Sequence, residues 1–137
     1  MSYPTKITFV LKSPLLQHYV DDFNQDFDES IKVDAVVDLK FGADTINQAV
    51  PLIIWIATTY SEGIIEALGE KTFDLVLSKL NVFITKYCKT SKGQATDIKI
   101  KITTGETKYE FEATNVTEQN VDNALLNFHS TVLKQTK

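Results

Sequence analysis

The stretch ATDIKIKITTGETKYEFEAT, from Ala95 to Thr114, has the pattern of two antiparallel strands joined by a tight turn. Gly105-Glu106 suits a two-residue type II′ turn, because glycine at the first turn position tolerates a positive φ. Pairing Thr104 with Thr107 then sets apolar residues opposite one another on one face and lysines opposite glutamates on the other: Ile102–Tyr109, Ile100–Phe111, Ile98–Ala113, Lys101–Glu110 and Lys99–Glu112. Both faces agree on one register, so the sequence predicts a β-hairpin with one buried face.

Two earlier segments alternate between apolar and polar residues in the same way. Ile7, Phe9 and Leu11 share one side of a first predicted strand. Residues 31–41 alternate more regularly, with one apolar face formed by Ile31, Val33, Ala35, Val37, Leu39 and Phe41. Such a period predicts strands with one face on the core and one face that can meet water.

Helices are predicted between and after these strands. Ser13-Pro14 is typical of a helix start, with serine as N-cap and proline in the first helical position. Residues 47–90 have a helical pattern, with bends or ends at Gly63 and Gly69. The apolar run from Ala49 to Ala57 is shorter than the ~20 residues that a membrane span needs, so it is predicted to be a buried helix.

The last helix has a clear start, with Thr117 as N-cap, Val116 and Val121 spaced for a hydrophobic staple, and Glu118 in its first turn. The element order is then β-α-β-α-α-β-β-α within one domain, residues 1–137. We expect an α+β fold, a two-layer sandwich of about four strands in a mixed or antiparallel sheet with helices packed on one face. The first two strands could lie side by side and parallel, or the hairpin could lie between them.

Composition narrows the class of partner. The net charge is -4 and all 14 basic residues are lysine, so the chain lacks the arginine fork that favours phosphate and guanine. We therefore expect no nucleic-acid partner and, from the short apolar run, no membrane insertion. The N-terminal residues do not have the pattern of a secretory signal, which favours a cytoplasmic location.

The acidic stretch VDDFNQDFDES, from Val20 to Ser30, places oxygen ligands at alternate positions, as a calcium loop does. With Asp22 as first ligand, however, the sixth and twelfth positions hold Phe27 and Val33, where a sharp turn needs glycine and the metal needs a glutamate. The stretch is better interpreted as a solvated acidic connector. No metal site and no cofactor are predicted.

Candidate catalytic groups are few. Cys88 is the single cysteine, and a nucleophile there needs His18 or His129 as its base, yet no cysteine signature surrounds it. Glu62 and Glu66 are predicted to share one helix face, where paired carboxylates without a histidine are usually solvated. We expect no enzyme activity. A catalytic alternative would require one of these histidines to lie beside Cys88 or a carboxylate cluster in a cleft.

The succession of elements resembles a small bacterial module, the effector-associated constant component of conflict systems. The resemblance rests on the helical region GIIEALGEKTFDLVLSKLNVFI, the hairpin DIKIKITTGETKYEFEAT and the last helix at VDNALLNF. Where the family usually has a tryptophan-leucine pair before the hairpin, this chain has Phe83-Ile84, and lysines replace arginines. The resemblance implies a non-catalytic adaptor that joins a sensor or processing component to an effector in antiviral defence.

Two functional hypotheses follow. The first is an intracellular protein-binding adaptor that docks another chain or self-associates, with Trp55 or Tyr60 as an exposed anchor, although the apolar neighbours of Trp55 favour its burial. The second is a small acidic inhibitor or immunity-type protein that blocks a toxin, nuclease or effector by charge complementarity. Its candidate interaction residues lie in the acidic segment: Asp21, Asp22, Asp26, Asp28 and Glu29.

Overall fold

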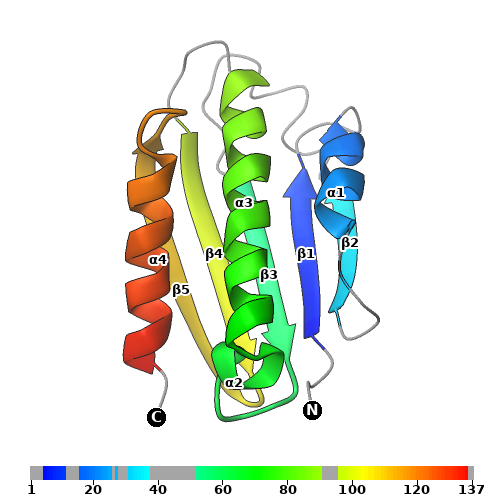
Figure 1. The fold of residues 1–137 in the computed structure, drawn as a ribbon, viewed down its shortest axis with the longest axis vertical. Coiled ribbons are helices and arrows are strands. Elements are labelled where there is room, and N and C mark those ends of the chain that lie inside the picture. Colours follow the sequence, from blue (N-terminus) through cyan, green and yellow to red (C-terminus); the bar gives the residue numbers. More distant parts are fainter. Residues whose placement is uncertain are drawn as a thin grey trace.

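The computed structural model describes residues 5–11, 16–25, 27, 31–37, 52–90 and 96–135. They form an α+β fold in which a five-stranded mixed sheet carries helices on one face (Figure 1). The strands are β1 (Thr5–Leu11), β2 (Ile31–Val37), β3 (Leu52–Thr58), β4 (Thr96–Thr104) and β5 (Thr107–Val116). The helices are α1 (Gln17–Asn24), α2 (Ile64–Leu68), α3 (Glu70–Thr90) and α4 (Val121–Gln135). The α+β class and the mixed sheet agree with the prediction.

The sheet has the strand order β2-β1-β3-β4-β5. The β1–β2 and β3–β4 pairs are parallel, whereas β1–β3 and β4–β5 are antiparallel. The first two strands therefore lie side by side and parallel, which was one of the two arrangements left open. The hairpin lies at the opposite edge of the sheet.

The predicted hairpin register is confirmed at every pair. Thr104 pairs with Thr107, the isoleucines of β4 lie opposite Tyr109, Phe111 and Ala113, and each lysine meets its glutamate. Gly105 has a φ of 59°, as the first position of the predicted turn requires. Its backbone N–H donates to the carbonyl of Thr58, 3.0 Å away, which fixes the turn against the end of β3.

The prediction of a buried helix from Ala49 to Ala57 is wrong. Residues 52–58 form β3, the central strand, while residues 49–51 lie outside the described part of the chain. Burial follows a period of two, with Leu52, Ile54, Ile56 and Thr58 buried on one side. β-branched isoleucines and an aromatic residue favour a strand. In a central strand the outward side chains are partly covered by those of the two adjacent strands, so they can be apolar too.

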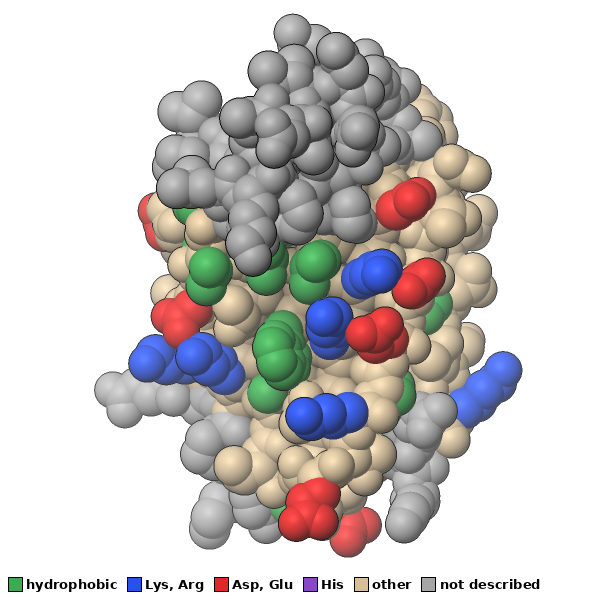
Figure 2. Space-filling model, turned by 180° about the vertical axis from the view of Figure 1, so that it is seen from behind, with side chains coloured by type: hydrophobic (Ala, Val, Ile, Leu, Met, Phe, Trp, Pro, Cys, Tyr) green, Lys and Arg blue, Asp and Glu red, His purple; other side chains and the backbone are tan. Residues whose placement is uncertain are grey.

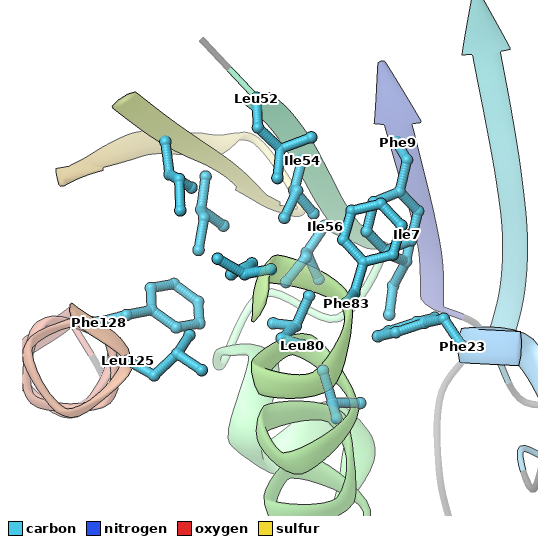
Figure 3. Close-up of a cluster of buried hydrophobic side chains, with 14 of the residues drawn as sticks. Ile7, Phe9, Phe23, Leu52, Ile54, Ile56, Leu80, Phe83, Leu125 and Phe128 are labelled. Carbon is cyan, nitrogen blue, oxygen red and sulfur yellow. The ribbon is translucent and has the colours of Figure 1, made fainter. Parts of the chain in front are cut away.

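A single apolar core fills the space between the helices and one face of the sheet (Figure 3). Phe9 of β1 is fully buried in this core, with ring centroids 4.9 Å from Phe23 of α1 and 4.3 Å from Phe83 of α3. At the other side, Phe128 of α4 packs on Phe111 of β5 at 5.5 Å. The three longer helices therefore cover the same sheet face.

One helix boundary within the described residues differs from the prediction. The last helix begins at Val121, because residues Thr117 to Asn120 form a turn in which the Thr117 N–H donates to the Asn120 side chain at 2.8 Å. The backbone carbonyl of Asn120 then accepts from the Ala124 N–H, which starts the helix. The predicted α1 start at Ser13-Pro14 lies outside the described residues, as do Leu39 and Phe41.

Every helix in the described part of the chain is too short or too polar to span a lipid bilayer.

Candidate functional site

The sheet face opposite α1, α3 and α4 is the candidate site, and we call it the open face. No described helix lies over it (Figure 1). Strand pairing arranges its side chains in three rows of five, each running from β2 to β5. The rows are Val36–Val10–Ile53–Lys99–Glu112, Asp34–Thr8–Trp55–Lys101–Glu110 and Lys32–Lys6–Ala57–Thr103–Lys108.

Trp55 is the central residue of this array. Its side chain is 43% exposed, and Val36 at the edge of the same face is 52% exposed. Figure 2 shows hydrophobic side chains gathered in the middle of this face, with lysine side chains beside them. The expectation that Trp55 is buried in the core is therefore wrong, because β3 alternates and Trp55 points away from the helices.

The indole of Trp55 is held by the neighbouring strand. Its Nε1–H donates to Thr103 Oγ1 at 3.1 Å, and the Lys101 ammonium lies 6.0 Å from the ring centroid. The hydrogen bond to Thr103 and the Lys101 ammonium thus orient the ring, while part of the ring remains exposed. A large aromatic side chain that is already ordered loses little conformational freedom on binding, which suits an anchor at an interface.

Three ion pairs cross the open face between neighbouring strands. Lys6 Nζ is 3.2 Å from Asp34, Lys99 Nζ is 3.6 Å from Glu112, and Lys101 Nζ is 4.0 Å from Glu110. All six side chains are at least one-third exposed, so each pair contributes only about 0–1 kcal/mol to folding. These groups can therefore change partners at small cost.

The other predicted interaction residues lie elsewhere. Tyr60 follows β3, is half-buried, and donates its backbone N–H to Thr58 Oγ1 at 3.3 Å. Asp21 and Asp22 are exposed on α1, on the helical side of the sheet. Asp22 is 3.4 Å from Lys86 Nζ of α3. The structure therefore does not bring the acidic residues of α1 together with Trp55.

The remaining acidic candidates, Asp26, Asp28 and Glu29, lie outside the described residues. Among the residues that are described, no group of three or more histidine, cysteine, aspartate or glutamate side chains could hold a metal ion.

The candidate nucleophile Cys88 is buried at the C-terminal end of α3, with its Sγ 3.6 Å from the Val116 carbonyl. Burial raises the pKa of its thiol, and the nearby Glu118 carboxylate raises it further, whereas a hydrogen bond with Thr96 lowers it. The net shift disfavours the thiolate, which is the reactive form.

Neither histidine contacts this thiol. The ring of His129 packs at 5.5 Å on the ring of Phe73, which lies fifteen residues before Cys88 on α3, or about 22 Å along the helix at 1.5 Å per residue. His18 is exposed on α1, against the ring of Tyr19 at 4.1 Å.

The two candidate carboxylates do not share a helix, contrary to the prediction. Glu62 lies in the turn before Gly63, and α2 begins only at Ile64, so Glu66 alone is helical. The sequence suggested a longer helix because the apolar run and α2 were interpreted as one element. With β3 as a strand, a turn must follow it, and Glu62 lies in that turn.

Two shallow grooves flank α3 on the helical side of the sheet, one on each side of the helix. The groove between α3 and α4 encloses about 510 Å³ and has Leu77, Leu125 and Leu126 on its walls beside Asp74 and Asp122. The groove between α1 and α3 encloses about 340 Å³. The groove between α3 and α4 also has Ser78 and His129 on its walls, so it places one candidate base in a cleft beside two carboxylates. The ring of His129 packs there on Phe73, at 5.5 Å between ring centroids.

Comparison with known proteins adds no assignment, since no protein-family model matches the sequence and neither a curated protein nor a solved structure does.

Proposed function

We propose that the protein is a non-catalytic adaptor module that binds another protein chain through the open face of its sheet. The observation that carries this proposal is the exposure of Trp55, 43%, at the centre of a sheet face that no described helix covers. Exposed aromatic residues surrounded by polar groups are typical of binding hot spots. The resemblance of residues 63–84, 97–114 and 121–128 to the effector-associated constant component supports a role in a bacterial conflict or antiviral defence system, in the cytoplasm.

The energetics of Trp55 favour docking. Covering the rest of a half-exposed tryptophan removes roughly 80 Å² of apolar surface from water, which is worth about 2 kcal/mol at 25 cal/mol per Å². That free energy corresponds to about a thirtyfold change in Kd. The small ion pairs around the ring can form a polar rim of the kind that surrounds such anchors.

The position of Cys88 supports binding rather than catalysis by a cysteine nucleophile. Cys88 is buried with a raised pKa, and Phe73, on which His129 packs, lies about 22 Å from it along α3. A nucleophile and its base must approach to roughly 3 Å, so this pair does not meet that requirement.

Affinity capture from the cells that make the protein tests the proposal. Trp55→Thr removes the anchor and keeps a residue that favours strands, whereas Leu126→Gln removes a 63% exposed leucine from α4 and serves as the matched control. Quantitative mass spectrometry should show a partner that the wild type and the Leu126→Gln variant retain and the Trp55→Thr variant loses. Equal capture by all three would contradict docking through the open face.

The acidic inhibitor is the alternative, and its exposed carboxylates Asp21 and Asp22 lie on α1. Asp22 already pairs with Lys86, which reduces the negative field available to a basic partner. Charge reversal by Asp21→Lys distinguishes the two functions, because it should leave capture through Trp55 unchanged. Loss of the partner in this variant alone would favour the inhibitor.

A further inference from the structure

Lysines, rather than carboxylates, border the apolar part of the open face. Strand pairing places Lys99 beside Ile53, Lys101 beside Trp55, and Lys6 beside Ala57. The carboxylates of Glu110 and Glu112 lie one strand further out on β5, and that of Asp34 lies on β2 at the other edge. A molecule seated on Trp55 and its apolar neighbours therefore meets ammonium groups before it meets carboxylates.

The charge of this face is opposite in sign to that of the whole chain. Its three rows hold five lysines (6, 32, 99, 101 and 108) and three carboxylates (34, 110 and 112), and Asp97 adds a fourth carboxylate on the same side of β4, for a net of +1, whereas the chain carries -4. The positive sign is local, so it favours an acidic ligand at the open face while the rest of the surface does not.

The bordering lysines are arranged to exchange partners. Each lies 3.2 to 4.0 Å from a carboxylate, and their side chains are 40–54% exposed. The carboxylates in these pairs are also solvated, so they return to water at little cost when a ligand carboxylate replaces them. The Lys101 ammonium also faces the Trp55 ring. A ligand that covers this ring therefore places the polar groups at its own edge within reach of Lys101.

We propose that the open face binds an acidic amphipathic segment of a partner protein, which places an apolar side chain against Trp55 and Ile53 and carboxylates beside Lys6, Lys99 and Lys101. This inference rests on the proposed function, and it specifies the chemistry of the partner.

Two other occupants fit less well. A nucleic acid carries a continuous line of phosphates, which would have to pass Asp34 at one edge or Glu110 and Glu112 at the other. A second copy, turned about an axis parallel to β3 and packed face to face, would lay β4 over β1 and bring Lys99 and Lys101 toward Lys6. Like charges would then meet at the border of the apolar part.

Selection from a displayed library of random 16-residue peptides tests the proposal on the full chain. Peptides that bind the wild type and fail to bind Trp55→Thr should be enriched in aspartate and glutamate around one or two apolar residues. Enrichment of neutral or basic peptides that depend on Trp55 would overturn the acidic chemistry and leave the docking function intact. Failure to recover any Trp55-dependent peptide would overturn both.

Fluorescence titration then identifies the groups that select the charge. Trp55 is the single tryptophan, so its emission reports occupancy of the open face by a peptide without tryptophan. The double variant Lys6→Gln, Lys101→Gln should weaken the selected peptide about tenfold and reduce the salt dependence of Kd, because two border charges are lost. The control Lys71→Gln, Lys134→Gln, with the same charge change on α3 and α4, should bind within about twofold of wild type. Equal weakening in both variants would show general attraction only and overturn the proposal.

The same signal excludes or reveals the other occupants. Oligothymidylate and a rise in protein concentration should each leave the emission of Trp55 unchanged. A shift with oligothymidylate, or a salt-insensitive dimer that shifts the emission, would overturn the acidic segment in favour of a nucleic acid or a second copy.

Discussion

Threonine substitutions along β3 should cost stability at every second residue. Ile54 and Ile56 are completely buried. Replacing either with threonine removes about two carbon groups, worth roughly 1.6 kcal/mol, and buries a hydroxyl at a cost of about 1–3 kcal/mol, for a loss of about 3 kcal/mol. Ile53 and Ala57 lie on the open face, where the hydroxyl stays hydrated and threonine suits a strand. The same change there should cost less than about 1 kcal/mol.

Urea unfolding followed by far-ultraviolet circular dichroism measures this pattern without depending on tryptophan. With an m value of about 2 kcal/mol/M, the Ile54→Thr and Ile56→Thr variants should unfold about 1.5 M earlier than the wild type, while Ile53→Thr and Ala57→Thr stay within about 0.5 M. A helix would instead group residues 53, 56 and 57 on one face. A large loss at Ile53 with a small one at Ile54 would therefore refute the assignment of β3 as a central strand.

Three further predictions concern a glycine, a tyrosine and one ion pair. Gly69→Ala should cost about 1–3 kcal/mol in urea unfolding although no atom lies within 4 Å of the added carbon, because its φ of 86° and ψ of 150° belong to a region that only glycine adopts readily; a loss below about 0.5 kcal/mol would contradict this backbone. Burial, with a smaller contribution from Cys88, raises the pKa of Tyr87 to about 12. The free energy of unfolding should therefore be highest below pH 10 and fall by roughly 2 kcal/mol as pH rises toward 12. Unfolding curves compared at pH 8 and 11.5 should show a smaller fall for Tyr87→Phe. A double-mutant cycle on Lys101 and Glu110 should give a coupling of at most about 0.5 kcal/mol, since both groups are half-exposed, and a value above about 1.5 kcal/mol would show that the pair holds the hairpin together.

The hairpin could be predicted from the sequence because all of its determinants are local. Gly105 sets the turn, and the neighbours of the turn agree on one register on both faces. A one-residue slip would move Ile98, Ile100 and Ile102 to the other face, which makes the alternatives costly. The parallel pairing of β1 with β2 depends on a contact between segments separated by a helix, and the sequence left it open.

The central strand could not be recognised with the same certainty. An apolar run such as the nine residues from Ala49 to Ala57 fits a buried strand or a buried helix, and periodicity does not separate them when polar alternation is missing. In β3 the residues of the open face are Ile53, Trp55 and Ala57, which are as apolar as those of the core face. The outer apolar residues that form the candidate site are thus the reason why the strand was mistaken for a helix.

The candidate site followed from the strand order rather than from any motif. Trp55 was one of the proposed anchors, but its exposure depends on β3 being a strand at the middle of the sheet. Lys99 and Lys101 were predicted to face glutamates across the hairpin, and they do. Their position beside Trp55 requires the pairing of β3 with β4, which joins residues that are 46 positions apart. No local pattern carries that information.

The topology itself explains why the described helices lie on one face of the sheet. β1 and β3 are antiparallel neighbours; β1 crosses by way of α1 to β2 on one side, and β3 crosses by way of α2 and α3 to β4 on the other. In Figure 1, β1 points up with β2 to its right, β3 points down with β4 to its left, and the helices lie in front, so both crossovers are right-handed. The second crossover starts from a strand of opposite direction and moves to the opposite side of the sheet. These two reversals cancel, so two right-handed crossovers place their helices on the same face of the sheet.

Stability and binding are separated by this arrangement. The core is complete beneath the helices, where Phe9 contacts Phe23 and Phe83, and it does not use the outward side chains of the sheet. A substitution of Trp55 removes surface that is already partly hydrated and leaves no internal cavity, unlike a substitution of Ile54. Side chains of the open face can therefore be substituted to suit a partner with little effect on the free energy of unfolding. Loss of binding in Trp55→Thr at nearly unchanged stability is the result that distinguishes a docking anchor from a core residue.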